Sequence, residues 1–166
     1  MKILPNEKLT LLTELSKSKA IEILNLSIRP KQNFGFGNRK IEDGKKFEGS
    51  IFGDSFNISR IINYRNSFLP EISGKINEKM NGTEIEIELK QASFVKVFMI
   101  LWLGGVSFAF ITTLIGAIIG EGPIYVCIIP LFMFLAGFGM LKFGFSTESE
   151  KSKKDLIEIL QARIKK

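Results

Sequence analysis

Two long uncharged stretches, separated by four residues, constrain the fold of this chain more than any other feature of its sequence. The first covers residues 97–119 and the second residues 124–141, with Gly120-Glu121-Gly122-Pro123 between them. A run of about 18 or more apolar residues is long enough for a transmembrane helix. Two such runs joined by a Gly/Pro turn predict a helical hairpin across a membrane, which places both ends of the chain on one side.

The lysines that flank the hairpin indicate its orientation. The net charge is +6, and the basic residues nearest to the two spans are Lys90, Lys96, Lys142, Lys151, Lys153 and Lys154. Basic flanks remain in the cytoplasm, so we expect cytoplasmic termini and an external Glu121. The same lysines predict contact with anionic lipid headgroups. Because basic and acidic residues are mixed and no nucleic-acid motif is present, nucleic acid is not an expected partner.

The chain contains no histidine, and its one cysteine, Cys127, lies in the second span. The most common general base and metal ligand is therefore absent, and neither an intrachain disulfide nor a cysteine zinc site can form. Carboxylates such as Glu48 and Glu71 are present, but nothing in the sequence brings two of them together. We therefore expect a protein that is not an enzyme and that has no cofactor or metal site.

The rest of the sequence predicts a small α+β domain. Gly53-Asp54 and Asn81-Gly82 each separate two alternating apolar and polar segments, as in β-hairpins. Residues 6–17 have leucines at helical spacing behind a candidate N-cap, and residues 21–29 resemble a strand that ends at Pro30. Thr147 and Glu150 have the spacing of a capping box, which predicts a further amphipathic helix near the C-terminus.

The expected fold class is thus an α+β membrane protein. It has a small antiparallel β-meander with N- and C-terminal amphipathic helices, and a two-helix transmembrane hairpin. The expected divisions are a cytoplasmic domain over residues 1–93, the hairpin over 94–145, and a cytoplasmic helix over 146–166.

The segment between the two β-hairpins is the least generic part of the domain. It follows Arg60 closely and contains Tyr64, Arg65 and Asn66. Planar hydrogen-bonding groups of this kind suit a carboxylate or phosphate, because arginine offers a bidentate fork. These four residues are the candidate ligand site. The alternative is a structural corner, in which asparagine and serine bond the backbone and an arginine pairs with a glutamate.

Small residues mark candidate contact faces on the two spans, because they let membrane helices approach closely. Either the two spans pack on each other through these residues, or some of the residues pack between subunits. The residues are Gly105, Ala109, Thr112, Gly116, Gly120 and Gly137.

A longer pattern links these parts. Residues 64–70 read Tyr-Arg-Asn-Ser-Phe-Leu-Pro, residues 72–76 read Ile-Ser-Gly-Lys-Ile, and Gly82-Thr83 opens a strand before the first span. In this order the chain resembles small bacterial two-span membrane proteins of unknown function, over about residues 45–145. The resemblance implies the bacterial inner (plasma) membrane and carries no known activity or cofactor.

Two functions follow as hypotheses. The first is a non-enzymatic binding or regulatory module, anchored by the hairpin, whose β domain recognises a protein or a small anionic ligand. The second is an oligomeric membrane effector, in which the domain senses a signal and the hairpins form a pore or disturb the bilayer. In both, the expected partners are the bilayer and either further copies of the chain or another protein.

Overall fold

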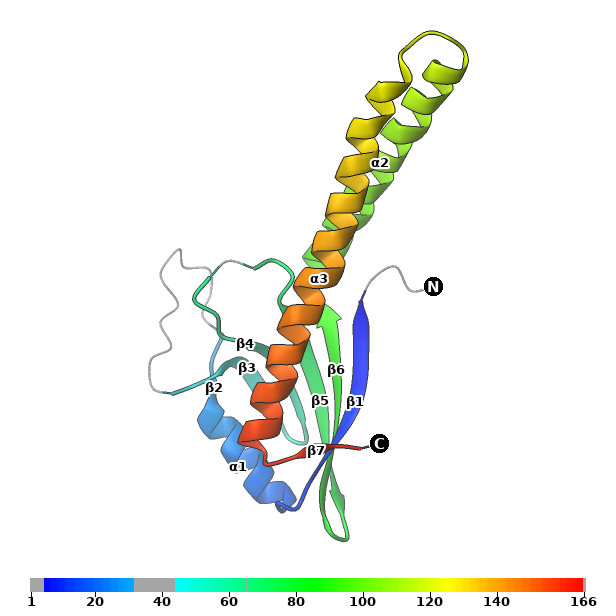
Figure 1. The fold of residues 1–166 in the computed structure, drawn as a ribbon. Helices are drawn as coiled ribbons and strands as arrows, with labels where there is room; N and C mark the ends of the chain where they lie inside the picture. The colour runs from blue at the N-terminus through cyan, green and yellow to red at the C-terminus, as the bar shows by residue number, and fades with distance from the viewer. Residues whose placement is uncertain (1–4, 32–43, 65, 166) are drawn as a thin grey trace.

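The computed structural model describes residues 5–31, 44–64 and 66–165. Over these residues the chain forms one seven-stranded sheet, three α-helices and a short 3₁₀ turn, η1 (Figure 1). The sheet has the order β2-β3-β4-β5-β6-β1-β7. The strands are β1 (Asn6–Thr13), β2 (Ile28–Arg29), β3 (Phe47–Phe52), β4 (Ser55–Arg60), β5 (Pro70–Lys79), β6 (Gly82–Gln91) and β7 (Arg163–Ile164). The helical elements are α1 (Lys17–Ser27), α2 (Ser93–Ile118), η1 (Ile124–Cys127) and α3 (Ile128–Ile159).

The two predicted β-hairpins are confirmed. Strands β3 to β6 form an antiparallel meander whose tight turns contain Gly53, with φ +56°, and Gly82, with φ +121°. Glycine tolerates this left-handed region at no steric cost. The sheet extends beyond the meander, because β2 pairs parallel to β3 and β1 pairs antiparallel to β6.

The predicted N-terminal amphipathic helix is wrong, because this segment is strand β1. Its residues pair with β6 from Asn6 opposite Lys90 to Thr13 opposite Thr83. Alternation, rather than helical spacing, decides which side chains point inward, and Leu11 is fully buried. The edge of β6 offers backbone hydrogen-bonding partners along the whole of this segment. This pairing outweighs a local leucine spacing that also fits a helix.

The strand predicted for residues 21–29 is also wrong over most of its length, because residues 17–27 form α1. The Ser16 side chain accepts a hydrogen bond from the Lys19 backbone N–H at 3.4 Å, as an N-cap does. Ala20 and Leu24 are fully buried and lie one turn apart, so they place one face of α1 on the sheet. Only Ile28 and Arg29 form a strand.

The predicted C-terminal helix is present, but it is not a separate element. It is the second half of α3, which runs without a break for 32 residues from the tip of the hairpin to Ile159. In Figure 1 this helix leaves the hairpin and continues down across the domain. The Thr147–Glu150 pair therefore lies in mid-helix and caps nothing.

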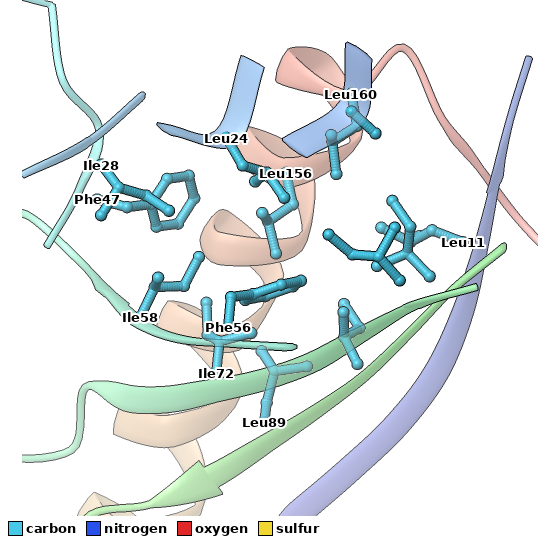
Figure 2. Packing of buried hydrophobic residues seen from close by; sticks show 14 of the residues in the cluster. Leu11, Leu24, Ile28, Phe47, Phe56, Ile58, Ile72, Leu89, Leu156 and Leu160 are labelled. Carbon is cyan, nitrogen blue, oxygen red and sulfur yellow. The ribbon is translucent and has the colours of Figure 1, made fainter. Parts of the chain in front are cut away.

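The hydrophobic core lies between one face of the sheet and the helices α1 and α3, as Figure 2 shows. Leu24 of α1 and Leu156 and Leu160 of α3 are fully buried against side chains from the strands. Gly74 of β5 faces Phe56 of β4, and an added Cβ at Gly74 would lie 2.1 Å from the Phe56 ring. The glycine therefore leaves the space that the aromatic ring fills.

The hairpin of α2 and α3 projects away from the domain (Figure 1). Both helices are long and apolar enough to cross a membrane, and their most apolar windows are only 17% and 22% buried. A core helix of a soluble protein would have most of this surface covered. Many large apolar side chains of the two helices are instead exposed, among them Phe98, Leu101, Phe108, Ile115, Phe132 and Leu135.

Candidate functional site

Three of the four predicted ligand-site residues, Arg60, Tyr64 and Asn66, lie where the domain meets the hairpin. Arg60 is the last residue of β4 and points toward α3. Its Nε donates to Asp155 Oδ2 at 2.7 Å, and its Nη1 donates to Glu148 Oε2 at 3.1 Å. The Tyr64 hydroxyl donates to the other oxygen of the Glu148 carboxylate, Oε1. Arg65 lies outside the described residues.

Asn66 does not join this cluster. Its Oδ1 accepts a hydrogen bond from the Phe68 backbone N–H at 2.9 Å, which is a local turn of the kind that asparagine favours. The structure thus brings Arg60 and Tyr64 together around Glu148 and leaves Asn66 to shape the loop.

Glu148 is the central residue that sequence reasoning missed. It is 2% exposed, although it is a carboxylate. A signal was present in the sequence: Glu148 lies on the helix face that also carries Phe145, Ser152 and Leu156, so it falls on the buried stripe of α3.

The charges in this cluster balance one another. Glu148 lies beyond Leu141, where the apolar part of α3 ends, and packs against the domain. Burial alone would raise the pKa of its carboxyl, but hydrogen bonds from Tyr64 and Lys151 and the Arg60 charge outweigh burial and lower it. Burial would lower the pKa of Arg60, but its bonds to Asp155 and the nearby carboxylates raise it. Both groups are therefore held in their charged forms.

This balance bears on the predicted ligand site. Two N–H groups of the Arg60 guanidinium already donate to carboxylates of α3, and the Tyr64 hydroxyl already donates to Glu148. An anionic ligand would have to displace Asp155 from Nε and Glu148 from Nη1 and the Tyr64 hydroxyl to reach them. In the described arrangement the cluster acts as a connection between β4 and α3, and ligand binding at these residues stays a prediction.

A second connection lies on the same side of the hairpin base. Phe68 packs into a small apolar cluster between the first turns of α2 and the middle of α3. Gly144 makes room for it, because a Cβ there would lie 2.9 Å from Phe68 Cδ2. Gln91, which is 1% exposed, donates from Nε2 to the Ser67 carbonyl at 3.2 Å. The other cluster members are Ala92, Val95, Met99, Leu103, Phe134 and Leu141.

We call residues 60–64 and 66–68, together with Gln91, Gly144, Glu148 and Asp155, the joint. The joint fixes the end of β6, the start of α2 and the middle of α3 to one another. Segments that are far apart in the sequence thereby hold the hairpin at a defined angle to the sheet.

The predicted helix-packing residues have divided roles. Gly137 lies against Trp102, with an added Cβ 3.0 Å from the indole nitrogen. Gly105 and Gly116 have open space where a side chain would be, and Ala109 and Thr112 are exposed. Gly120 has φ +84°, so it serves the turn. Of the six, Gly137 alone is shown in contact with the other span in the described part of the chain.

The uncovered face of the sheet carries a shallow groove of about 620 Å³. Hydroxyl, amide and charged side chains line it, and the exposed Phe52 stands at one side. At its border, hydrogen bonds from Lys90 and Asn6 lower the pKa of Glu88 to about 2. The polar lining includes Lys8, Thr10, Ser55, Asn57, Ser73, Lys75 and Glu86.

Within residues 5–31, 44–64 and 66–165, no group of three or more histidine, cysteine or acidic side chains is placed to hold a metal ion. No protein-family model matches the chain, and neither curated proteins nor solved structures give a significant match. The resemblance to bacterial two-span membrane proteins therefore stays a prediction.

Proposed function

We propose that this chain is a non-enzymatic binding or regulatory module, anchored by the hairpin in the bacterial inner membrane with both termini in the cytoplasm. One observation carries the proposal: α3 is continuous from the exposed apolar hairpin into the domain core. A helix shared in this way leaves no flexible linker between anchor and domain. A change in one part is therefore transmitted to the other.

The groove on the uncovered sheet face is the surface that we assign to recognition. The opposite face is filled by α1 and α3, so the uncovered face is the one that remains accessible to a partner. Its amides, hydroxyls and lysines offer hydrogen bonds to a protein or a small anionic ligand. Arg60 and Tyr64 would serve as a second, switchable site only if Glu148 and Asp155 were displaced.

The anchoring and the orientation can be tested by cysteine labelling in cells. In a Cys127→Ser background, Glu121→Cys should react with a membrane-impermeant maleimide, while Lys154→Cys should react only after the membrane is opened. Labelling of Lys154→Cys in intact cells, with Glu121→Cys protected, would show the opposite orientation.

Recognition can be tested by purifying the full chain in mild detergent and measuring its native mass. We expect a co-purifying protein or small molecule that is lost in Asn57→Arg, which fills the groove, and kept in Lys154→Gln, which lies away from it. Purification of the wild type with nothing bound, from cells that express it at natural levels, would count against the proposal.

The rigidity of the connection between the hairpin and the domain can be tested separately. Spin labels at Glu121→Cys and Asn77→Cys, again with Cys127→Ser, should give one narrow distance distribution. The same pair in a Phe68→Ala background should give a broader distribution. A broad distribution in the intact chain would contradict a rigid joint.

The exposed small residues favour a second candidate function, the oligomeric effector. Gly105 and Gly116 are not covered by the other span, so a face suited to close helix contact is left free. If it serves assembly, Gly105→Leu with Gly116→Leu should reduce the mass in detergent and abolish leakage from vesicles. A monomeric wild type that causes no leakage would refute this alternative.

A further inference from the structure

Two lysines at the base of the hairpin point to the same side of it. Lys96 directly follows Val95, and Lys142 directly follows Leu141; Val95 and Leu141 are buried in the contact between α2 and α3. Each residue of an α-helix is turned by about 100° from the one before it. Because α2 and α3 run in opposite directions (Figure 1), equal rotations along the two chains turn both lysines to one side.

The joint occupies the other side. Gly144 comes three residues after Leu141, a rotation of about 300° around the helix. This is equivalent to about 60° in the direction opposite to Lys142. Phe68 packs there, on Gly144. The side that carries the two lysines is therefore not the side that the loop of the joint covers.

Both lysines also lie at a similar depth, since Gly137 lies beside Trp102 and Leu103 and the two helices run antiparallel, which brings Lys96 close to the level of Lys142. Lys96 is 23 residues before Ile119 at the end of the first uncharged stretch, or roughly 34 Å of helix, against a hydrocarbon thickness of about 30 Å. The lysine ammonium groups thus lie at headgroup level. Phe94 and Phe143, 80% and 74% exposed, lie close to them along the helices and suit the same interface.

Neither lysine has an ion pair or hydrogen bond with any residue that the structure describes. The neighbouring helix positions 92–100 and 138–146 contain no acidic residue. By contrast, Lys46, Lys151 and Lys153 in the domain are each paired with a carboxylate. Exposed Ser93 and Ser146 lie three residues before Lys96 and four residues after Lys142, so their hydroxyls share this side.

We propose that Ser93, Lys96, Lys142 and Ser146 form a binding site for the phosphate of an anionic glycerophospholipid. Two ammonium groups with no internal counter-ion supply the charge, and two hydroxyls supply further donors. The proposal rests on the proposed membrane anchoring, and it adds a specific lipid that fixes the depth of the hairpin and the height of the domain above the bilayer.

The chain's one tryptophan allows a direct test. Trp102 lies six residues after Lys96, or about 9 Å further into the bilayer. The full chain is placed in vesicles of phosphatidylcholine with some phosphatidylglycerol, and one of the two lipids carries brominated acyl chains, which quench tryptophan fluorescence. We expect on the order of tenfold enrichment of phosphatidylglycerol around Trp102, from two basic residues near the surface.

Two double variants distinguish lipid binding at this site from a general effect of net charge. Lys96→Gln with Lys142→Gln should abolish the enrichment. Lys79→Gln with Lys154→Gln removes the same charge at the far end of the sheet and on the distal part of α3, and should keep it. Far-UV circular dichroism of both double variants checks that they fold.

The outcomes are distinct. Equal quenching by the two brominated lipids in the wild type, or enrichment that survives loss of both lysines, would overturn the lipid site and leave the anchoring intact. Equal quenching by the two lipids, together with binding of inorganic phosphate that Lys96→Gln with Lys142→Gln abolishes, would overturn it in favour of a soluble phosphate ligand. No quenching by either lipid would refute the membrane anchoring itself.

Discussion

The contact between Gly144 and Phe68 makes the sharpest prediction about the joint. An alanine Cβ at position 144 would lie 2.9 Å from Phe68 Cδ2 and 3.1 Å from Phe68 Cβ. These distances are too short for carbon atoms, and the second atom is next to the backbone, so the loop has to move. We therefore expect Gly144→Ala to disturb the joint through Phe68 alone.

The expected magnitude has two opposing terms. Overfilling a packed site costs about 1–3 kcal/mol, while glycine to alanine in a helix gains about 1 kcal/mol. Gly144→Ala should thus destabilise the wild type by about 0–2 kcal/mol. With Phe68→Ala the contact with the ring is absent and only the 3.1 Å contact with the Cβ of residue 68 remains, so the same change should be close to neutral, within about 1 kcal/mol. Phe68→Ala alone should cost about 2 kcal/mol, roughly half of the value for a fully buried phenylalanine.

The assay is guanidinium unfolding in detergent micelles, followed by far-UV circular dichroism, for the four chains of the double-mutant cycle. The predicted coupling is about 1 kcal/mol, with Gly144→Ala less destabilising in the Phe68→Ala background than in the wild type. Identical effects of Gly144→Ala in both backgrounds would show that Gly144 does not make room for Phe68, and the reasoning would be refuted.

Three further predictions concern the core, the buried carboxylate and the hairpin surface. Gly74→Ala places a Cβ 2.1 Å from the Phe56 ring and should cost about 3 kcal/mol in the same unfolding assay, with partial rescue by Phe56→Leu. The lowered pKa of Glu148 means that its contribution is complete above the ordinary glutamate pKa of about 4.3 and is lost as pH falls through the folded value. Thermal unfolding should show the wild type losing stability from pH 7 to pH 3, and a flatter profile with lower stability at pH 7 for Glu148→Gln. Gly105→Leu should not destabilise a single chain, because its side faces open space and leucine is the better helix former; a loss of stability in dilute micelles would show that the glycine is covered.

The parts that could be predicted from the sequence have strong local signals. Two β-hairpins were predicted from Gly53-Asp54, Asn81-Gly82 and the alternation beside them, because turn geometry and strand periodicity are properties of a few adjacent residues. The hairpin of α2 and α3 was predicted from length and apolarity alone.

The errors have a common physical cause. The segment of β1 has leucines that fit a helix or a strand, and only the free edge of β6 selects the strand. In α1, Ala20 and Leu24 face a core whose other members are far away in the sequence. Local propensity is weak when long-range pairing decides between two acceptable patterns.

The candidate site shows the same division. The segment from Arg60 to Asn66 stood out by composition, and the structure places Arg60, Tyr64 and Asn66 at the base of the hairpin. Its partners, Glu148 and Asp155, come from the opposite end of the chain and could not be assigned from spacing.

Length and apolarity are properties of contiguous residues, so they were enough to predict two helices that can cross a membrane. The way in which that hairpin is attached to the domain follows from the folded structure. The continuity of α3, the Glu148 contacts and the fit of Phe68 on Gly144 depend on residues brought together from distant segments. That Lys96 and Lys142 lie on the same side of the hairpin also follows only from the packing of the two antiparallel helices. The sequence of either helix alone does not show which of its faces contacts the other helix.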